Sequence, residues 1–224
     1  MKNYKVGLIH ATLNSVNPIL AAFAKNFPEI ETVNFMDEGL LRALDKEGEI
    51  TPKLVERFAS LLGRAVETEV DGILLSCSAY SPTITEMRKR FPQLPIENVD
   101  DAMIEQAVKL GSRIGVVASV ATAGPTTEIA VKEKAEALGK EVEVFVEVNT
   151  EAFAALNKKE FEAHDSYIAS SVKKLLDKQV DLIILAQLSM ARAKTSLKDV
   201  DIPILTSPDI SSNKIVSEIE AFYR

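Results

Sequence analysis

Cys77, the sole cysteine of the sequence, is the residue whose type and surroundings best suit acid–base chemistry. It follows an aliphatic segment and precedes a hydroxyl-rich turn at residues 78–82. A thiol at such a turn lies near a helix start, where free backbone N–H groups and the helix dipole favour the thiolate. Lone cysteines also commonly fill space in a core, and the local sequence leaves both interpretations open.

The two histidines are the other groups that titrate near neutral pH. His10 ends the first aliphatic segment and would reach the same edge as Cys77 if the two segments form neighbouring strands. There it could exchange a proton with the thiol or stabilise the thiolate, or simply bond a backbone carbonyl. His164 lies among acidic and hydroxyl residues in a predicted helix, and we expect it on a solvent-exposed helix face.

A second group of polar residues follows the aliphatic segment that ends at Ala118. Ser119 and Thr122 stand at the entry to a predicted helix, where hydroxyls and free backbone N–H groups can hold a carboxylate. Serine and threonine are also favoured at such positions for purely local reasons. The sequence has no glycine-rich phosphate loop, metal-ligand helix or nucleophile elbow.

These residues lie within a regular alternation of short β-rich apolar segments and longer amphipathic ones. Such alternation predicts an α/β fold in which parallel sheets are covered by helices on both faces. We expect strands at residues 4–9, 31–35, 72–75, 113–118, 142–148, 182–185 and 203–205, and helices at residues 17–26, 52–69, 82–90, 101–110, 125–138, 159–178 and 212–223.

An internal repeat divides the chain into two similar halves. Residues 71–77 can be laid over residues 181–187 at an offset of 110 positions, and Gly7 over Gly115 at an offset of 108. Buried parallel strands share such patterns by chance, which is the alternative interpretation. The repeat predicts two α/β lobes, with the ligand in a crevice between them at the carboxyl ends of the strands. The predicted lobes are residues 1–97 with 208–224, and residues 98–207.

The composition excludes several classes of protein. Of the 224 residues, 46% are hydrophobic and 26% charged, as in ordinary globular proteins. The net charge of −7, without a basic stripe, argues against nucleic-acid binding. One cysteine and two histidines cannot form an internal disulfide or a Cys/His-rich zinc site, so we expect no metal. No apolar segment approaches the roughly 18 residues of a membrane helix, so a cytoplasmic protein without membrane contact is expected.

Residues 74–79, Leu-Leu-Ser-Cys-Ser-Ala, resemble the first cysteine motif of the aspartate/glutamate/hydantoin racemase superfamily. The resemblance extends to residues 7–12, 115–122 and 181–193, and therefore covers most of the chain in order. It implies two pseudosymmetric lobes with a substrate carboxylate held between them, activity without a cofactor, and a homodimer. The expected partner is a small carboxylic or amino acid.

The resemblance also implies roles for individual residues. Cys77 would be the acid–base thiol, and His10 would replace an acidic residue that assists the first cysteine in amino-acid racemases of this type. The carboxylate would be bound by Ser78 through its hydroxyl, by Ala79 through its backbone N–H, and by Ser119 and Thr122.

The sequence departs from the family pattern at Gln187. The racemases that it resembles have a second cysteine on the opposite side of the substrate, and the repeat puts Gln187 at that position. A glutamine amide cannot exchange a proton as a thiol does, which argues against a two-thiol mechanism. The leading hypothesis is a racemase-like isomerase that uses Cys77, with His10, Ser189 or a water molecule supplying the second proton relay, while Gln187 and Ser189 contact substrate. A malonate-type decarboxylase and a small-acid binding protein that has lost catalysis are the alternatives.

Overall fold

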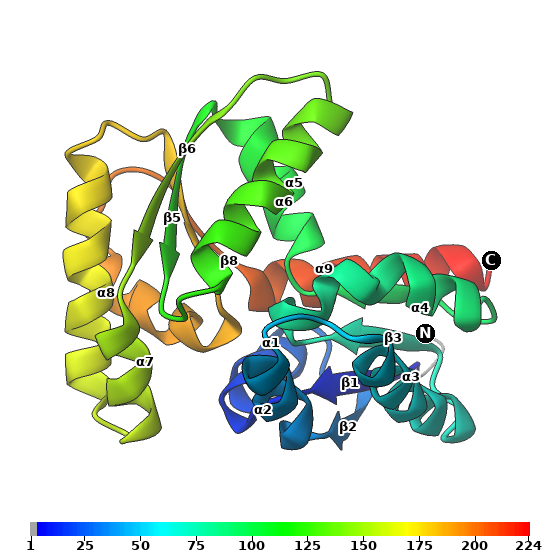
Figure 1. The fold of residues 1–224 in the computed structure, drawn as a ribbon. Helices are drawn as coiled ribbons and strands as arrows, with labels where there is room; N and C mark the ends of the chain where they lie inside the picture. The colour runs from blue at the N-terminus through cyan, green and yellow to red at the C-terminus, as the bar shows by residue number, and fades with distance from the viewer. Residues whose placement is uncertain (1–3) are drawn as a thin grey trace. The chain divides into compact units, whose positions relative to one another are not determined.

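The computed structural model describes residues 4–224; the first three residues, which the predicted first lobe includes, lie outside the described part. The chain forms two compact units (Figure 1). Of the described residues, 4–99 and 208–224 make up one unit, here called the first lobe, and Asp100–Ser207 make up the second lobe.

The first lobe contains a four-stranded parallel sheet in the order β2-β1-β3-β4. The central strands β1 and β3 consist almost entirely of buried residues, as expected for strands covered by helices on both faces. The strands are β1 Lys5–His10, β2 Glu31–Met36, β3 Gly72–Leu75 and β4 Ile96–Asn98; the helices are η1 Leu13–Ser15, α1 Val16–Asn26, α2 Glu38–Glu47, α3 Pro52–Glu67, η2 Ser78–Thr83, α4 Ile84–Arg90 and α9 Ser207–Phe222.

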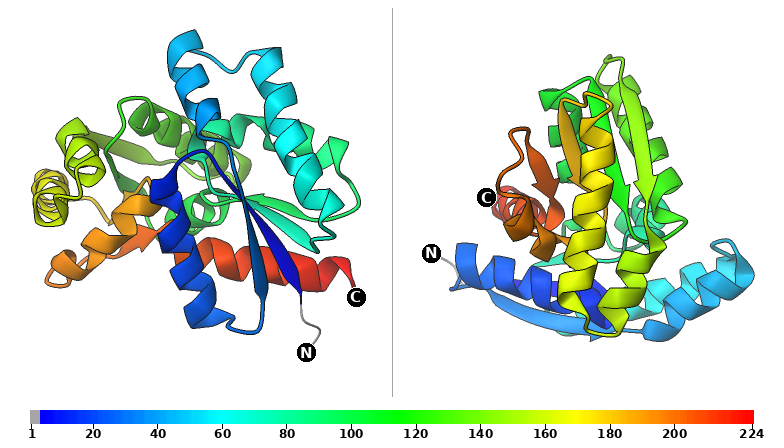
Figure 2. Two further views of the ribbon diagram at one scale, coloured as in Figure 1. Left: turned by 90° about the horizontal axis from the view of Figure 1, so that it is seen from below. Right: turned by 90° about the vertical axis from the view of Figure 1, so that its left-hand side faces the viewer.

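The second lobe repeats this arrangement with a parallel sheet in the order β6-β5-β7-β8. Helix α8 runs along one face of this sheet (Figure 2). The strands are β5 Arg113–Ala118, β6 Glu143–Val148, β7 Leu182–Leu185 and β8 Ile204–Thr206; the helices are α5 Asp101–Leu110, α6 Ala123–Ala137, α7 Thr150–Asn157, α8 Phe161–Leu176 and η3 Leu188–Leu197. The predicted α/β class with a parallel sheet in each half is therefore confirmed.

The internal repeat is visible in how each central strand packs. Gly7 in β1 and Gly115 in β5 let a helix and the neighbouring strand approach closely, because glycine has no side chain to keep them apart. A Cβ atom at either glycine would lie 3.1–3.5 Å from three side chains. For Gly7 these belong to Ala65, Val70 and Ile73, and for Gly115 to Leu175, Val180 and Ile183, each 110 positions later.

Several predicted elements need correction. Strand β4 and helices α2 and α7 were missed, because β4 has three residues and the two helices follow their strands almost without a break. The helix predicted at residues 82–90 begins as an α-helix only at Ile84, since Pro82 lies within the 3₁₀ helix η2. The helix predicted from residue 159 starts at Phe161, because Lys159 has a positive φ of 62°. The last helix starts at Ser207 rather than at residue 212.

Between residues 4 and 224, the structure contains no helix with the length and apolar character needed to cross a membrane.

The contact between β3 and α9 predicts the effect of adding one methyl group. A Cβ atom on Gly72 would lie 2.6 Å from Ile219 Cγ1 and 2.7 Å from Ile219 Cδ1. Gly72→Ala should therefore destabilise the first lobe by about 1–3 kcal/mol in urea unfolding, through overpacking. Gly63→Ala is the control, because Gly63 lies in α3 with nothing within 4 Å of its Cβ position, and alanine favours helix by about 1 kcal/mol. A Gly72→Ala protein as stable as the unmodified one would contradict this packing.

Candidate functional site

Cys77 follows β3 at the carboxyl edge of the first sheet. Its backbone is extended, with φ −113° and ψ 103°, and its carbonyl accepts a hydrogen bond from the Tyr80 N–H at 3.1 Å, which begins η2. The residue is 8% exposed and belongs to the hydrophobic cluster that includes Ile9 and Leu75. The thiol therefore lies at the rim of a core and at the start of a helical turn.

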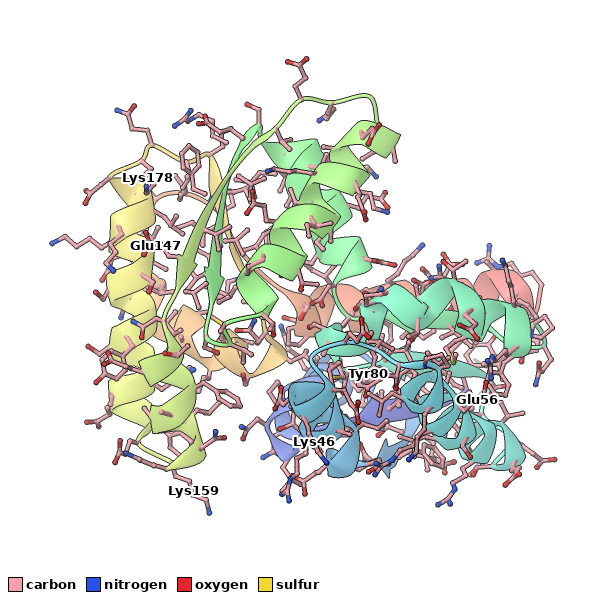
Figure 3. The ribbon with its side chains drawn as sticks, viewed as in Figure 1. Lys46, Glu56, Tyr80, Glu147, Lys159 and Lys178 are labelled. Atoms are coloured by element: carbon pink, nitrogen blue, oxygen red, sulfur yellow. The ribbon has the colours of Figure 1, made fainter. Side chains whose placement is uncertain are left out.

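Tyr80 anchors the turn that follows Cys77. Its hydroxyl donates to the Leu40 carbonyl at 3.0 Å, and its ring stacks on Phe58 at a centroid distance of 4.7 Å. Figure 3 shows Tyr80 inside the first lobe, beside α2 and α3. Burial, together with the nearby charge of Cys77, raises the pKa of Tyr80 to about 12. Tyr80 is therefore neutral at ordinary pH and holds the turn in place.

His10 is fully buried and engaged through both ring nitrogens. Its Nε2 lies 2.9 Å from Asn34 Oδ1, and its Nδ1 lies 2.6 Å from Ser76 Oγ and 3.0 Å from Ser15 Oγ. Because the Asn34 oxygen accepts from Nε2, Nδ1 accepts from a serine hydroxyl in the neutral ring. Burial lowers the pKa of His10, and the hydrogen bond to Asn34 opposes that shift only in part. His10 therefore lies in a closed hydrogen-bond network as a neutral side chain.

The register of β1 and β3 places His10 beside Ser76, the residue before Cys77. Ile9 pairs with Leu75, so that His10 comes level with Ser76 one step further along. Successive residues of an extended chain point to opposite faces, and Cys77 shares its face with Ile9 and Leu75. The structure therefore links His10 to Cys77 through Ser76, and the two side chains lie on opposite faces of the sheet edge.

Gln187 occupies the corresponding edge of the second sheet, after β7. Its backbone repeats the geometry of Cys77, since its carbonyl accepts from the Met190 N–H at 3.0 Å. Its Oε1 accepts from the Ser119 backbone N–H at 2.7 Å and from Ser119 Oγ at 3.0 Å. Its Nε2 is buried and has no hydrogen-bond partner among residues 4–224. The amide is thus held by its oxygen, and its two N–H groups can donate to a further acceptor.

The remaining predicted substrate-binding residues also lie at the carboxyl edges of the two sheets. Ser78 and Ala79 are half-buried at the start of η2, and Ser189 is 9% exposed in η3. Thr122 is exposed before α6, where its carbonyl accepts from the Thr126 hydroxyl at 2.8 Å. In the first lobe the structure therefore brings Cys77, Ser78 and Ala79 to one edge, and in the second it brings Ser119, Thr122, Gln187 and Ser189 to the other sheet's edge.

The prediction that His164 lies on an exposed helix face is wrong, because the side chain is fully buried. His164 shares the inner face of α8 with Ile168 and Leu175, which follow at helical spacing. Its Nδ1 lies 2.7 Å from Asp165 Oδ1, and Asp165 also accepts from the Arg192 guanidinium at 3.0 and 3.2 Å. Of the acidic neighbours that suggested exposure, Glu160 and Glu162 are exposed, whereas Asp165 is half-buried against His164.

Between residues 4 and 224, no group of three or more histidine, cysteine or acidic side chains is placed to hold a metal ion.

Comparison with known proteins identifies the family. The model of the Asp/Glu/Hydantoin racemase family matches residues 12–214, and the chain belongs to this family. Membership supports the coarse assignment of the protein as an enzyme of the isomerase class, of racemase type. Among curated protein sequences, none matches this chain.

Solved structures of racemases share the fold at low sequence identity. The chain is similar to glutamate racemase from Francisella tularensis, at 16% identity and a TM-score of 0.73 over 99% of this chain and 82% of that one. It is also similar to aspartate racemase from Picrophilus torridus, at 14% identity and a TM-score of 0.72. That alignment covers 96% of this chain and 94% of the other. Allantoin racemase from Klebsiella pneumoniae aligns at 14% identity and a TM-score of 0.68, over 98% of this chain and 89% of the other.

The buried network around His10 predicts how stability depends on pH. Because burial lowers the pKa of His10 from its ordinary value of 6.5, the unfolded chain binds a proton at this residue before the folded protein does. The free energy of unfolding should therefore fall as the pH drops through 6.5, and the fall should level off below the folded-state pKa. His10→Gln should show a smaller loss of stability between about pH 7.5 and about pH 5.5 in urea unfolding, because glutamine does not titrate.

Ser76→Ala serves as the control for this measurement. It removes one hydrogen bond, worth about 1 kcal/mol, while the imidazole remains, so that overall stability falls and the pH dependence persists. An equal pH dependence in the unmodified and His10→Gln proteins would show that His10 is not held neutral in the fold.

Proposed function

We propose that this protein is a cofactor-independent isomerase that transfers a proton at the α-carbon of a small carboxylic or amino acid. Cys77 is the acid–base group. The observation that supports this most is the position of the sole cysteine, which lies at the rim of the first lobe's core and at a helical turn, in a chain of the racemase family. Glutamate, aspartate and allantoin, the compounds named for the similar structures, belong in the first substrate panel.

The reaction requires stabilisation of negative charge. Removal of a proton next to a carboxylate places additional charge on its oxygens, and a fixed donor at such an oxygen is worth about 3 kcal/mol. Gln187 suits this role because Ser119 already holds its oxygen and leaves its N–H groups available. Ser78 and the Ala79 N–H at the start of η2, with Thr122 and Ser189, are the further groups we propose to bind the acid.

His10 supports the thiol from the opposite face of the sheet edge. Its hydrogen bond to Ser76 holds the residue before Cys77, and its neutral ring places no charge beside the thiol. We therefore assign His10 a positioning role in the proposed reaction.

Gln187 favours two alternatives that do not need a second thiol. A decarboxylase of malonate-like acids would release CO₂ and use Cys77 to protonate a single face. A binding protein that has lost catalysis would bind acids without exchanging any proton, and its affinity would survive Cys77→Ser. Measurements of CO₂ release and of ligand-induced thermal shifts distinguish these two from an isomerase.

The role of Cys77 predicts loss of isotope exchange. In D₂O the unmodified protein should incorporate deuterium at the α-carbon of its substrate, and Cys77→Ala should reduce the rate by about 10²–10⁴ because the acid–base group is gone. Proton NMR of the candidate acids measures this directly. Unchanged exchange in Cys77→Ala would contradict the assignment, and far-UV circular dichroism checks that the variant is folded.

The role of Gln187 predicts a loss in turnover. Gln187→Leu removes the donors and should lower kcat by about 10²–10³, as seen when one oxyanion donor is lost. Gln187→Glu should weaken binding as well, since a second carboxylate repels the substrate. Ser119→Ala is the matched control with a smaller expected effect, because the Ser119 backbone N–H still holds residue 187. If kcat were the same in the unmodified protein and in the Gln187→Leu, Gln187→Glu and Ser119→Ala variants, the proposed role of Gln187 would be wrong.

A further inference from the structure

The second lobe contains a buried histidine on the same sheet face as Gln187. Leu175 of α8 packs on Gly115 near the start of β5, and Ile168 joins the cluster that contains Val117 and Leu185. Helix α8 therefore runs antiparallel to β5, and His164, one turn before Ile168, lies towards the carboxyl end of the sheet. By strand alternation, Gln187 points to the face that Leu185 shares with α8.

Two buried nitrogen atoms on this face have no hydrogen-bond partner among the described residues. They are His164 Nε2 and Gln187 Nε2, and the side chain of His164 is fully buried. A buried polar atom without a partner costs about 1–3 kcal/mol, so groups left in this state in a folded protein require an explanation. A hydrogen-bond acceptor would satisfy Gln187 Nε2, and a donor would satisfy an unprotonated His164 Nε2.

The first lobe shows that the fold itself does not require a polar side chain at this place. The repeat offset of 110 that relates Leu175 to Ala65 relates His164 to Leu54. Leu54 is an ordinary member of the hydrophobic cluster that includes Cys77. The lobe with the thiol thus has leucine at this position, and the lobe without a thiol has histidine.

Asp165 prepares the His164 ring for proton transfer. Burial by itself would raise the pKa of Asp165, but hydrogen bonds from Arg192 and His164 outweigh it and hold the pKa below its usual value. The ionised carboxylate accepts from Nδ1, which leaves Nε2 as a bare acceptor in the neutral ring. A carboxylate that orients an imidazole in this way also stabilises the imidazolium formed when Nε2 takes up a proton.

We propose that His164 is the second proton-relay residue of the reaction, acting through a water molecule shared by His164 Nε2 and the Gln187 amide. This inference rests on the proposed function. The water oxygen takes the α-proton as one of the water's own protons moves to Nε2, which leaves a carbanion stabilised by hydrogen bonds and an imidazolium paired with Asp165. Cys77 then donates its thiol proton to the carbanion and becomes a thiolate; the reverse reaction exchanges the two roles.

Stereochemistry provides the test, because a single acid–base group returns the proton to the face from which it was taken. Enantiomerically pure substrate in D₂O is followed by proton NMR and by chiral chromatography. His164→Gln keeps a hydrogen-bonding side chain that cannot relay a proton, and it should lower racemisation at least about 10²-fold while Cys77-dependent exchange with retention continues. Asp165→Asn should lower kcat with KM nearly unchanged.

His164→Leu is a second variant, which introduces the residue type found at the corresponding position, Leu54, of the first lobe. It should behave as His164→Gln does. Lys173→Gln, on the exposed side of α8, is the control and should keep full racemisation. In the unmodified protein, ¹⁵N NMR of the neutral form of the His164 ring should show its proton on Nδ1, the nitrogen that contacts Asp165.

The outcomes separate this inference from the function on which it rests. Racemisation at the unmodified rate in folded His164→Gln would overturn the role of His164 and leave that of Cys77 intact. Exchange with retention only, in the unmodified protein, would overturn the inference and favour a reaction in which Cys77 is the single acid–base group. Absence of any exchange with the whole panel would overturn the proposed function and this inference together.

Discussion

The parallel pairing of the two central strands in each lobe determines where the candidate groups at the strand ends lie. Ile9 pairs with Leu75 in the first sheet and Val117 with Leu185 in the second. Parallel strands end at the same edge, so the residues two positions beyond these pairs meet there. In the second lobe this brings Ser119 within hydrogen-bond distance of the Gln187 side chain.

The two copies of this arrangement have diverged in the polar groups they bury. In the first lobe, His10 and three partners form a closed network beneath the turn that carries Cys77. In the second lobe, Ala118 stands at the corresponding end of β5, and the buried polar groups instead lie on the opposite face, beneath α8. Because buried polar groups are stable only when they are hydrogen-bonded, the closed network suits a structural role and the open one suits a ligand.

The fold was predictable because its local signals were strong. The strands at 72–75, 113–118 and 182–185 were predicted with the bounds that the structure shows, since each is an aliphatic segment with polar or turn residues at its ends. Gly7 and Gly115 marked the repeat, and the structure shows them in equivalent packing. Helices α2 and α7 were missed because they leave no clear turn signal between strand and helix.

Residue types and their spacing were enough to predict the α/β class, the two similar halves and the family resemblance. These features depend on the alternation of apolar and polar residues within short segments of the sequence. The partners of the polar side chains were decided only by tertiary structure. Ser76 bonds His10, 66 positions away in the sequence, and Ser119 bonds Gln187, 68 positions away. The register of the paired strands brings these residues together. The burial of His164 could not be predicted from its acidic neighbours in the sequence. The rotation of a helix relative to its sheet decides which of its side chains are exposed to solvent.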